Sequence, residues 1–338
     1  PMAGELTALS PTTVATQTSP IGVVVSPDNK SLYVTYERGT TLSQYSRNTE
    51  TGKLTALSPA TLQTGSEPRT AAISPDGKSV YVANFGSETV SQFSRNPETG
   101  KLTALSPAAV KTGDSPHGIE VSPDGKSVYV ANYWGNSIYQ YSRNPETGTL
   151  TALSPATVVA GKNPNSIIIS SDGKSVYTAD RGNKAVSQYS RNLETGTLTA
   201  LVPATIEAGE LPHDAAISPD GKTVYVTNSG SATVSLYGRN AETGKLTALG
   251  PATVATGREP SSVTVSSDGK SAYVTDGGAA TVSQYSRNPE TGSLTPLTHA
   301  TIASGISPYG VTASPDGKFV YVANESSGSL SQYARAHP

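Results

Sequence analysis

The sequence repeats every 48 residues, and this period constrains the fold more than any other feature. Its clearest marker is a turn of the Pro-Asp-Gly-Lys type, whose aspartate recurs at constant spacing (76 − 28 = 48) without insertion or deletion. Seven such units account for 336 of the 338 residues, and a repeat fold can grow as one body by adding similar units. The seven aspartates are Asp28, Asp76, Asp124, Asp172, Asp220, Asp268 and Asp316.

Each unit contains four short segments that favour β-strands. In the second unit we predict strands over residues 71–74, 79–83, 89–94 and 101–105, which are rich in β-branched and aromatic residues or alternate between apolar and polar ones. Turns with proline, glycine and asparagine separate them. Four strands in a unit of this length are typical of a propeller blade. We therefore predict an all-β fold, a seven-bladed β-propeller with four antiparallel strands in each blade.

The two ends of the sequence complement each other. The last unit stops near Arg335, before any fourth strand, whereas the chain begins with Gly-Glu-Leu-Thr-Ala-Leu over residues 4–9, which resembles the fourth strand at 52–57. The N-terminal strand is therefore expected to complete the last blade and to cover two unpaired sheet edges. This predicts a closed ring and one domain over residues 1–338.

Composition excludes several classes of function. Charged residues make up 15% of the chain and the formal net charge is −2, so no broad field favours nucleic acid. No apolar run approaches the roughly 20 residues of a membrane span, so we expect no membrane insertion. The sequence has no cysteine and therefore no disulfide or thiolate metal site. We expect no metal and no cofactor.

The unit reads Pro-x-x-Val-x-Val-Ser-Pro-Asp-Gly-Lys-Ser-Val-Tyr-Val-Ala/Thr-Asn, and one copy contains the literal sequence Tyr225-Val226-Thr227-Asn228. It resembles the YVTN-repeat and lactonase-type seven-bladed propellers, a superfamily of cell-surface repeat proteins and sugar lactonases. The resemblance covers the whole chain. It implies the propeller fold, but the matching residues belong to strands and turns that any member needs.

Comparison of the seven copies separates scaffold from site. A residue that is identical in every blade serves the architecture, so we interpret the repeated tyrosines as packing between blades and the repeated arginines as turn anchors or carboxylate partners. The tyrosines are Tyr33, Tyr81, Tyr129, Tyr177, Tyr225, Tyr273 and Tyr321. The arginines are Arg47, Arg95, Arg143, Arg191, Arg239, Arg287 and Arg335.

Three loop positions vary among the copies, and all three are expected on one face of the ring. Chain direction alternates between strands, so the loops before the first strand and after the second strand share a face, here called the top. Unselected drift of loop residues is the alternative explanation, although two of the four histidines occupy one register. We expect ligand-binding residues to rim the central channel or its mouth: Arg69, His117, Asn165, His213, Tyr309, Glu37, Arg181, Glu325, Tyr133 and Trp134.

Two acidic residues are expected deeper in the channel. Asp214 follows His213 by one residue on the innermost strand. Glu120 is unusual because its counterparts in the other copies are uncharged, and we expect it to project into the channel rather than into solvent at an edge. The counterparts are Val24, Ala72, Ile168, Ala216, Thr264 and Thr312.

These residues favour a binding or interaction module with a polar pocket, for a small polar or anionic molecule such as a sugar acid or lactone, or for a protein partner on the top face. The alternative is a lactone hydrolase of the 6-phosphogluconolactonase type. Lactonase-type propellers often carry Pro-His at the start of the first strand, as at His117 and His213 here. The resemblance then implies one of these histidines as base, Asp214 or Glu37 as its orienter, and Arg69 with Arg181 as anion clamp.

A structural surface protein or an engineered repeat scaffold is the third possibility, because near-identical units suit a module that presents one face to a partner. We expect a monomer. A secreted, periplasmic or cell-surface location is favoured over a cytoplasmic one.

Overall fold

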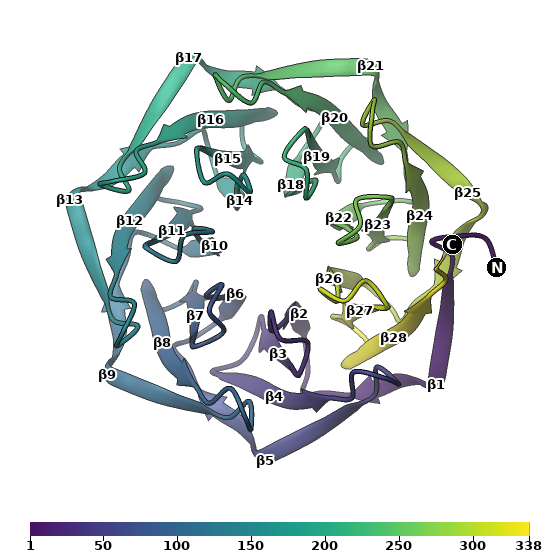
Figure 1. Cartoon of the computed structure of the whole chain (residues 1–338), viewed down its shortest axis with the longest axis horizontal. Helices are drawn as coiled ribbons and strands as arrows, with labels where there is room; N and C mark the ends of the chain where they lie inside the picture. Colours follow the sequence, from purple (N-terminus) through teal and green to yellow (C-terminus); the bar gives the residue numbers. More distant parts are fainter. Residues whose placement is uncertain (338) are drawn as a thin grey trace.

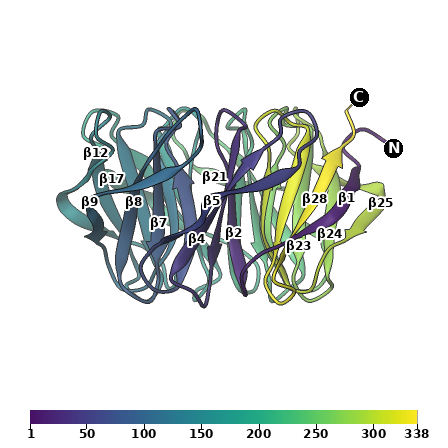
Figure 2. The same cartoon turned by 90° about the horizontal axis from the view of Figure 1, so that it is seen from below.

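The computed structural model describes residues 1–337, in which every element of regular structure is a β-strand. The strands form seven four-stranded antiparallel sheets arranged around a central axis (Figure 1). Seen from the side, the ring is a disc whose loops emerge on two opposite faces (Figure 2). The predicted fold class, a seven-bladed propeller with four antiparallel strands per blade, is confirmed.

The first strand of each blade lies innermost, next to the axis (Figure 1). Each of these strands begins at a proline, which lacks an amide hydrogen and is therefore tolerated at the first position of a strand. The prediction for the second unit began three residues too late, because it excluded this proline. The inner strands are β2 (Pro20–Val25), β6 (Pro68–Ile73), β10 (Pro116–Val121), β14 (Pro164–Ile169), β18 (Pro212–Ile217), β22 (Pro260–Val265) and β26 (Pro308–Ala313).

The second and third strands of each blade carry most of the core. The second strands are buried along their whole length because neighbouring blades cover both sheet faces. The second strands are β3 (Ser31–Tyr36), β7 (Ser79–Asn84), β11 (Ser127–Asn132), β15 (Ser175–Asp180), β19 (Thr223–Asn228), β23 (Ser271–Asp276) and β27 (Phe319–Asn324). The third strands are β4 (Thr41–Arg47), β8 (Thr89–Arg95), β12 (Ser137–Arg143), β16 (Ala185–Arg191), β20 (Thr233–Arg239), β24 (Thr281–Arg287) and β28 (Ser329–Arg335).

The fourth strands form the outer edge and are longer than predicted. In the second unit the strand runs on past Pro107, with a register shift in its pairing to β8, because an edge strand tolerates a proline and a bulge. Their side chains are largely exposed. The outer strands are β1 (Leu6–Ala15), β5 (Leu54–Gln63), β9 (Leu102–Lys111), β13 (Leu150–Val159), β17 (Leu198–Glu207), β21 (Leu246–Ala255) and β25 (Leu294–Ala303).

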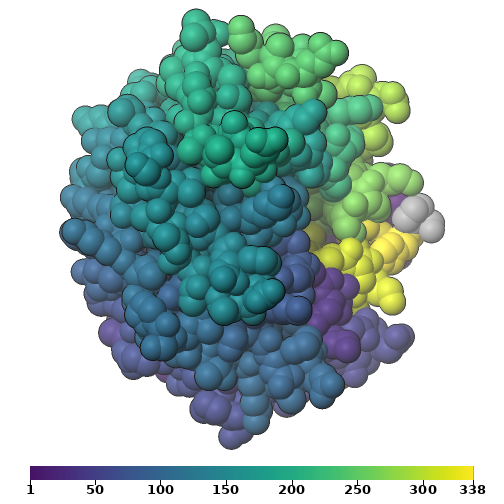
Figure 3. Space-filling view, turned by 60° about the vertical axis from the view of Figure 1, so that its left-hand side comes forward, coloured from purple at the N-terminus to yellow at the C-terminus, as the bar shows by residue number. Residues whose placement is uncertain are grey.

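The N-terminal strand closes the ring as expected. β1 pairs antiparallel with β28, from Leu6 opposite Arg335 to Ala15 opposite Ser329, so the last blade is β1-β28-β27-β26. In the space-filling view the colours follow one another round the ring until yellow meets purple (Figure 3). The two sheet edges are thus paired rather than exposed.

The hydrophobic core lies between blades rather than within one. Each apolar cluster joins side chains of two neighbouring sheets, as where Tyr81 and Val90 pack with Ile119 and Val128. The repeated tyrosine of every second strand is fully buried. Its hydroxyl donates to a glycine carbonyl of the next blade in all seven cases, as from Tyr33 to Gly100 at 2.5 Å. The predicted packing role of these tyrosines is confirmed.

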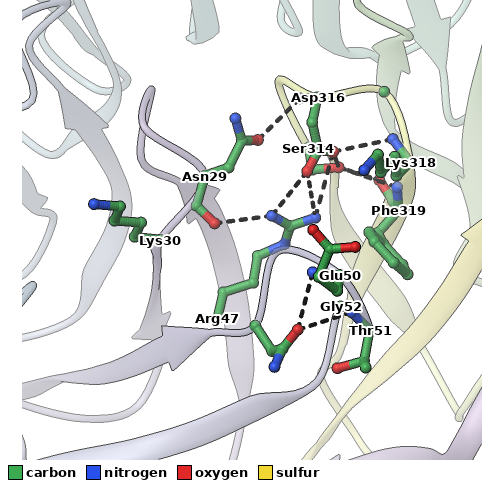
Figure 4. Close-up of polar contacts among 12 residues, drawn as sticks. Asn29, Lys30, Arg47, Glu50, Thr51, Gly52, Ser314, Asp316, Lys318 and Phe319 are labelled. Carbon is green, nitrogen blue, oxygen red and sulfur yellow. Dashed lines mark hydrogen bonds and ion pairs between the residues drawn. The ribbon is translucent and has the colours of Figure 1, made fainter.

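The repeated arginine and aspartate form an ion pair across each blade interface on the lower face. Arg95 pairs with Asp28 of the preceding blade, and its Nε donates to the hydroxyl of Tyr33. The seven ion pairs have N–O distances of 2.8–3.1 Å, and the arginine side chains are at most 2% exposed. At the closure the pair joins Arg47 to Asp316 (Figure 4). The interpretation of the arginines as carboxylate partners is confirmed.

Asp180 generates a testable prediction about stability. It ends a buried second strand where four other blades carry asparagine, and burial raises its pKa to about 7 from an ordinary value near 3.8. A carboxyl whose pKa is raised by folding stabilises the fold when protonated, so stability falls as pH rises from about 4 to about 7. The substitution Asp180→Asn should therefore stabilise the protein at pH 8 by on the order of 2 kcal/mol or more.

Urea unfolding of both proteins between pH 4 and pH 8 measures this effect. The advantage of the variant should grow with pH up to about 7 and stay constant above it. Asn132→Asp is the reverse control and should be less stable at pH 8. An advantage of Asp180→Asn that does not change with pH would contradict the burial argument.

Candidate functional site

The variable loops lie together on the top face, as their positions in the sequence predict. In each blade the loop after the second strand bonds to the loop before the first, as where the amide of Glu37 donates to the carbonyl of Ser19 at 2.9 Å and that of Phe85 to Glu67 at 3.0 Å. The ion-paired turns occupy the opposite, lower face. The two kinds of loop are therefore separated by the depth of the disc (Figure 2).

The central channel contains a cavity of about 190 Å³ below the top face. Its walls come from the inner strands of all seven blades. Four predicted rim residues line it, namely His117, Asn165, His213 and Tyr309, and so does Asp214. They follow the opening prolines of four inner strands, and this register brings residues 48 or more positions apart in sequence into one cavity.

A tyrosine joins the two histidines. The hydroxyl of Tyr309 lies 3.1 Å from Nε2 of His213 and 3.5 Å from Nε2 of His117. Nδ1 of His213 lies 2.8 Å from the carbonyl oxygen of Ser261. Because a carbonyl can only accept, Nδ1 carries the proton and Nε2 accepts from the tyrosine hydroxyl. Both nitrogens of His213 are therefore engaged.

His117 is the less satisfied of the two histidines. Its side chain is buried, with the residue 6% exposed, and within residues 1–337 its Nδ1 has no hydrogen-bond partner. Phe85 contacts its ring edge-on at 6.3 Å between centroids. Burial, with a smaller contribution from the nearby arginines, lowers the pKa of both histidines, that of His213 to about 4. Both rings are thus neutral at pH 7.

Two acidic side chains lie deeper in the cavity wall. Asp214 accepts hydrogen bonds from the hydroxyls of Ser166 at 2.8 Å and Ser262 at 2.5 Å, and from the amide of Val263 at 3.3 Å. Glu120, on β10, also lines the cavity, as predicted from its unusual side chain. Burial raises the pKa of both carboxyls, that of Glu120 to about 7.

The two arginines of the predicted anion clamp have different surroundings. Arg69 forms an ion pair with Glu37, lies 3.4 Å from Glu67, and has its guanidinium carbon 4.4 Å from the centroid of the Phe85 ring. Arg181 donates to the hydroxyl of Ser229 at 3.2 Å. Among the described residues no carboxylate pairs with it.

Arg181 lines a second, wider depression on the top face, which adjoins the channel. This depression has a volume of about 630 Å³ and shares His213, Ser261 and Tyr309 with the channel cavity. Glu325 lies on its wall. The predicted mouth residues Arg181 and Glu325 are therefore brought together with His213, whereas Arg69 and Glu37 pair with each other outside both cavities.

The predicted aromatic residues Tyr133 and Trp134 pack against each other beside the mouth. Tyr133 and Trp134 contact edge-on at 5.0 Å, and Tyr133 lies 6.3 Å from Phe85. Trp134 is 58% exposed. Neither Tyr133 nor Trp134 lines the channel cavity or the depression, although the centroid of the Tyr133 ring lies 6.4 Å from that of His117.

The histidine–carboxylate contact implied by the resemblance is absent. Asp214 binds serines and Glu37 binds Arg69, so neither orients a histidine. The carbonyl of Ser261 orients His213 instead. Sequence comparison missed this partner because Ser261 contributes its backbone, which carries no signal in the residue type.

The described residues show neither a metal-binding cluster nor a membrane-spanning helix. Residues 1–337 contain no group of three or more histidine, cysteine, aspartate or glutamate side chains positioned to hold a metal ion. They also contain no helix of the length and apolarity that a membrane crossing requires.

Comparison with known protein families shows to which family of propellers the chain belongs. The fold and the site define a seven-bladed propeller with a polar cavity at the top of its channel. The family described as "Lactonase, 7-bladed beta-propeller" matches residues 3–113, 104–202, 152–255 and 248–337. The chain belongs to this lactonase family. No curated protein sequence matches it.

Solved structures share the fold. A candidate 6-phosphogluconolactonase from Bacteroides uniformis is 26% identical, with a TM-score of 0.74, over 84% of this chain and 85% of that one. A candidate 6-phosphogluconolactonase from Bacteroides fragilis is 23% identical, with a TM-score of 0.75, over 86% of each chain. The periplasmic gluconolactonase PpgL of Pseudomonas aeruginosa is 19% identical, with a TM-score of 0.72, over 94% and 89%. The two latter likenesses show the fold alone.

The division between scaffold and site is testable by stability. Tyr129→Ala removes a fully buried ring and its interblade hydrogen bond, and we expect it to cost about 3 kcal/mol or more. His117→Ala and Arg69→Ala remove side chains of the top face that lie outside the buried ion-pair network of the lower face, so each should change the free energy of unfolding by less than about 1 kcal/mol. Equal destabilisation of all three variants in urea unfolding would contradict the division.

Proposed function

We propose that this protein hydrolyses a small sugar lactone in the channel cavity of its top face. The observation that carries the proposal is the hydrogen-bonded cluster of His117, Tyr309 and His213, which lines a cavity large enough for a small polar ring. Membership of the lactonase family and the likeness to 6-phosphogluconolactonases and a gluconolactonase support it.

The cluster supplies groups that lactone hydrolysis needs. Attack of water on the ring carbonyl places negative charge on its oxygen, and hydrogen-bond donors in a shielded site stabilise that charge. Tyr309 supplies such a donor when its one hydroxyl proton turns from Nε2 of His213 to the substrate oxygen. Burial raises the pKa of its hydroxyl, so the proton stays on the oxygen at neutral pH. The neutral ring of His117 adds a second donor at Nε2 when its proton is held there.

Arg181 is the side chain best placed to hold an anionic group on the lactone. It lies on the wall of the depression that adjoins the cavity, and no carboxylate among residues 1–337 neutralises it. Arg69 is already paired with Glu37. We therefore assign the predicted anion clamp to Arg181 alone, through charge-assisted hydrogen bonds to a carboxylate or phosphate.

This proposal reverses the order of the two leading predictions. The residues by themselves favoured a binding module over a lactone hydrolase, because the top loops are short and most blades are alike. The family and the solved relatives support the hydrolase. A binding module remains the second candidate, since the same cavity and Arg181 suit a sugar acid that is bound but not converted.

Location and assembly belong to the proposal as well. The Pseudomonas relative is named as periplasmic, which supports a periplasmic or secreted location for this chain. We propose a monomer with a small-molecule substrate, because β1 completes the last blade, so that every blade within the described residues has its four strands.

Proton release in a pH-stat tests the activity. With a panel of γ- and δ-sugar lactones, the native protein should release acid above the spontaneous rate. The double variant His117→Ala/His213→Ala should lose at least 100-fold in kcat, because it removes one donor and the partner of Tyr309. His299→Ala/His337→Ala removes the two histidines that line neither cavity and is the matched control. Absence of acid release from every lactone would contradict the proposal for these substrates.

Substrate charge tests the assignment of Arg181. Arg181→Ala should raise KM for a lactone that carries a carboxylate or phosphate about tenfold or more, since a hydrogen bond to a charged group contributes roughly 1.5–3 kcal/mol. KM for the neutral lactone should change little. Arg258→Ala is the matched control, because this exposed top-face arginine binds only the carbonyl of Gly278. An equal effect of Arg181→Ala on both substrates would refute the assignment.

A further inference from the structure

Glu120 occupies a position in the channel that no other blade fills with a charged residue. It lies on the inner strand β10, where the other copies carry valine, alanine, isoleucine or threonine. The side chain lines the channel cavity and also a second cavity of about 290 Å³ below it. Glu120 therefore lies where the two cavities meet.

The lower cavity leads toward the opposite face of the disc. Its walls are almost entirely apolar, and they include Pro27 and Pro315, which belong to the lower-face turns. Glu120 is the one ionisable side chain among its described lining residues. Water in the lower cavity would therefore approach Glu120 from the side opposite to a molecule bound at the top mouth.

The other ionisable groups of the upper cavity are already engaged. His213 uses both ring nitrogens, Nδ1 on the carbonyl of Ser261 and Nε2 on the hydroxyl of Tyr309. Asp214 accepts three hydrogen bonds that hold its carboxylate in place. These contacts leave neither group free to accept a proton from water without breaking an existing hydrogen bond.

His117 is also a poor base. Its Nδ1 is enclosed in the protein, away from the cavity solvent, and its Nε2 faces Tyr309. Burial and the neighbouring Arg69 and His213 lower its pKa well below the ordinary value. Proton transfer to this ring is therefore unfavourable at neutral pH.

Glu120, in contrast, is suited to accept a proton from water. Within residues 1–337 no side chain donates a hydrogen bond to its carboxylate, and the residue remains partly accessible from the channel. Burial raises the pKa to about 7 and the charge of Asp214 adds to this shift, whereas the amide of Val121 opposes it. The titratable residues that share its cavity are His117, His213, Asp214 and Tyr309. A base poised near the working pH is the most effective.

We infer that Glu120 is the general base of the proposed lactone hydrolysis and that the histidine–tyrosine cluster serves as the hydrogen-bond donor to the substrate carbonyl. The inference rests on the proposed function and differs from the histidine base that the family resemblance implies. It is carried by the free carboxylate at the junction of the two cavities, together with the engagement of every competing group.

The reaction balances with water as the only co-reactant. The Glu120 carboxylate takes a proton from a water molecule while the oxygen of that water forms a bond to the lactone carbonyl carbon. The tetrahedral intermediate then collapses, the ring C–O bond breaks, and the leaving oxygen takes the proton back from Glu120. The product is a hydroxy acid, whose carboxyl group releases one proton to solution.

The substitution Glu120→Gln tests the inference in the pH-stat. Because the base must be ionised, kcat of the native protein should rise with pH through about 7 and then level off. Glu120→Gln should lower the plateau by at least 100-fold and abolish this rise. Its KM should stay within a few-fold of the native value, because the substrate is held by the cluster and by Arg181.

Two further variants separate catalysis from structure. Glu120→Asp keeps a carboxylate and should recover part of kcat together with the dependence on pH. Thr264→Gln places the same amide at the equivalent register of another blade and should leave kcat and its pH profile unchanged. Melting temperatures of all variants exclude unfolding as the cause of a loss.

The outcomes distinguish the two proposals. An active native protein whose Glu120→Gln variant keeps the full rate and the same pH profile would overturn the assignment of Glu120 and leave the lactonase proposal standing. A loss of kcat that Thr264→Gln reproduces would also overturn it. A native protein that hydrolyses no lactone overturns both proposals at once.

Discussion

The rest of this structure depends on the network of ion pairs and hydrogen bonds that joins each blade to the next. A buried arginine at the end of the third strand reaches the turn aspartate of the preceding blade, and in six of the seven interfaces its Nε also meets the tyrosine hydroxyl of that blade. A buried charge is tolerated only when it is paired and hydrogen-bonded. The network therefore specifies how neighbouring sheets are oriented, and the apolar clusters fill the space between them.

This arrangement places the repeated ion pairs on one face and the candidate functional site on the other. The ion pairs and their turns repeat on the lower face, where any change would disturb a blade interface. The top loops bond mainly to each other within one blade, so their side chains can vary without loss of the ring. Because seven inner strands converge on one axis, single substitutions in different copies meet in one cavity. His117, His213 and Tyr309 come from three different blades.

The charged side chains of the channel differ in how deep they lie below the top face. Arg181 lies at the mouth, where solvent and substrate meet it, and Asp214 and Glu120 lie below, where burial raises their pKa values. Under the proposed function, an anionic substrate would be attracted to the mouth rather than to the deeper channel. A lactone held in this way would have its carbonyl near the donor cluster and its lower side toward Glu120 and the lower cavity.

The sequence by itself determined the ring. The uninterrupted spacing predicts seven blades, and the missing last strand predicts closure by residues 4–9, because pairing between strands depends on pattern and register. It also indicated which residues would surround the channel, since His117, Asn165, His213 and Tyr309 share one register. The tertiary structure decided which of them interact. Arg69 is neutralised by Glu37, Trp134 turns to solvent, and the carbonyl of Ser261 orients His213. Such pairings depend on distances between blades, and a repeat pattern does not encode them.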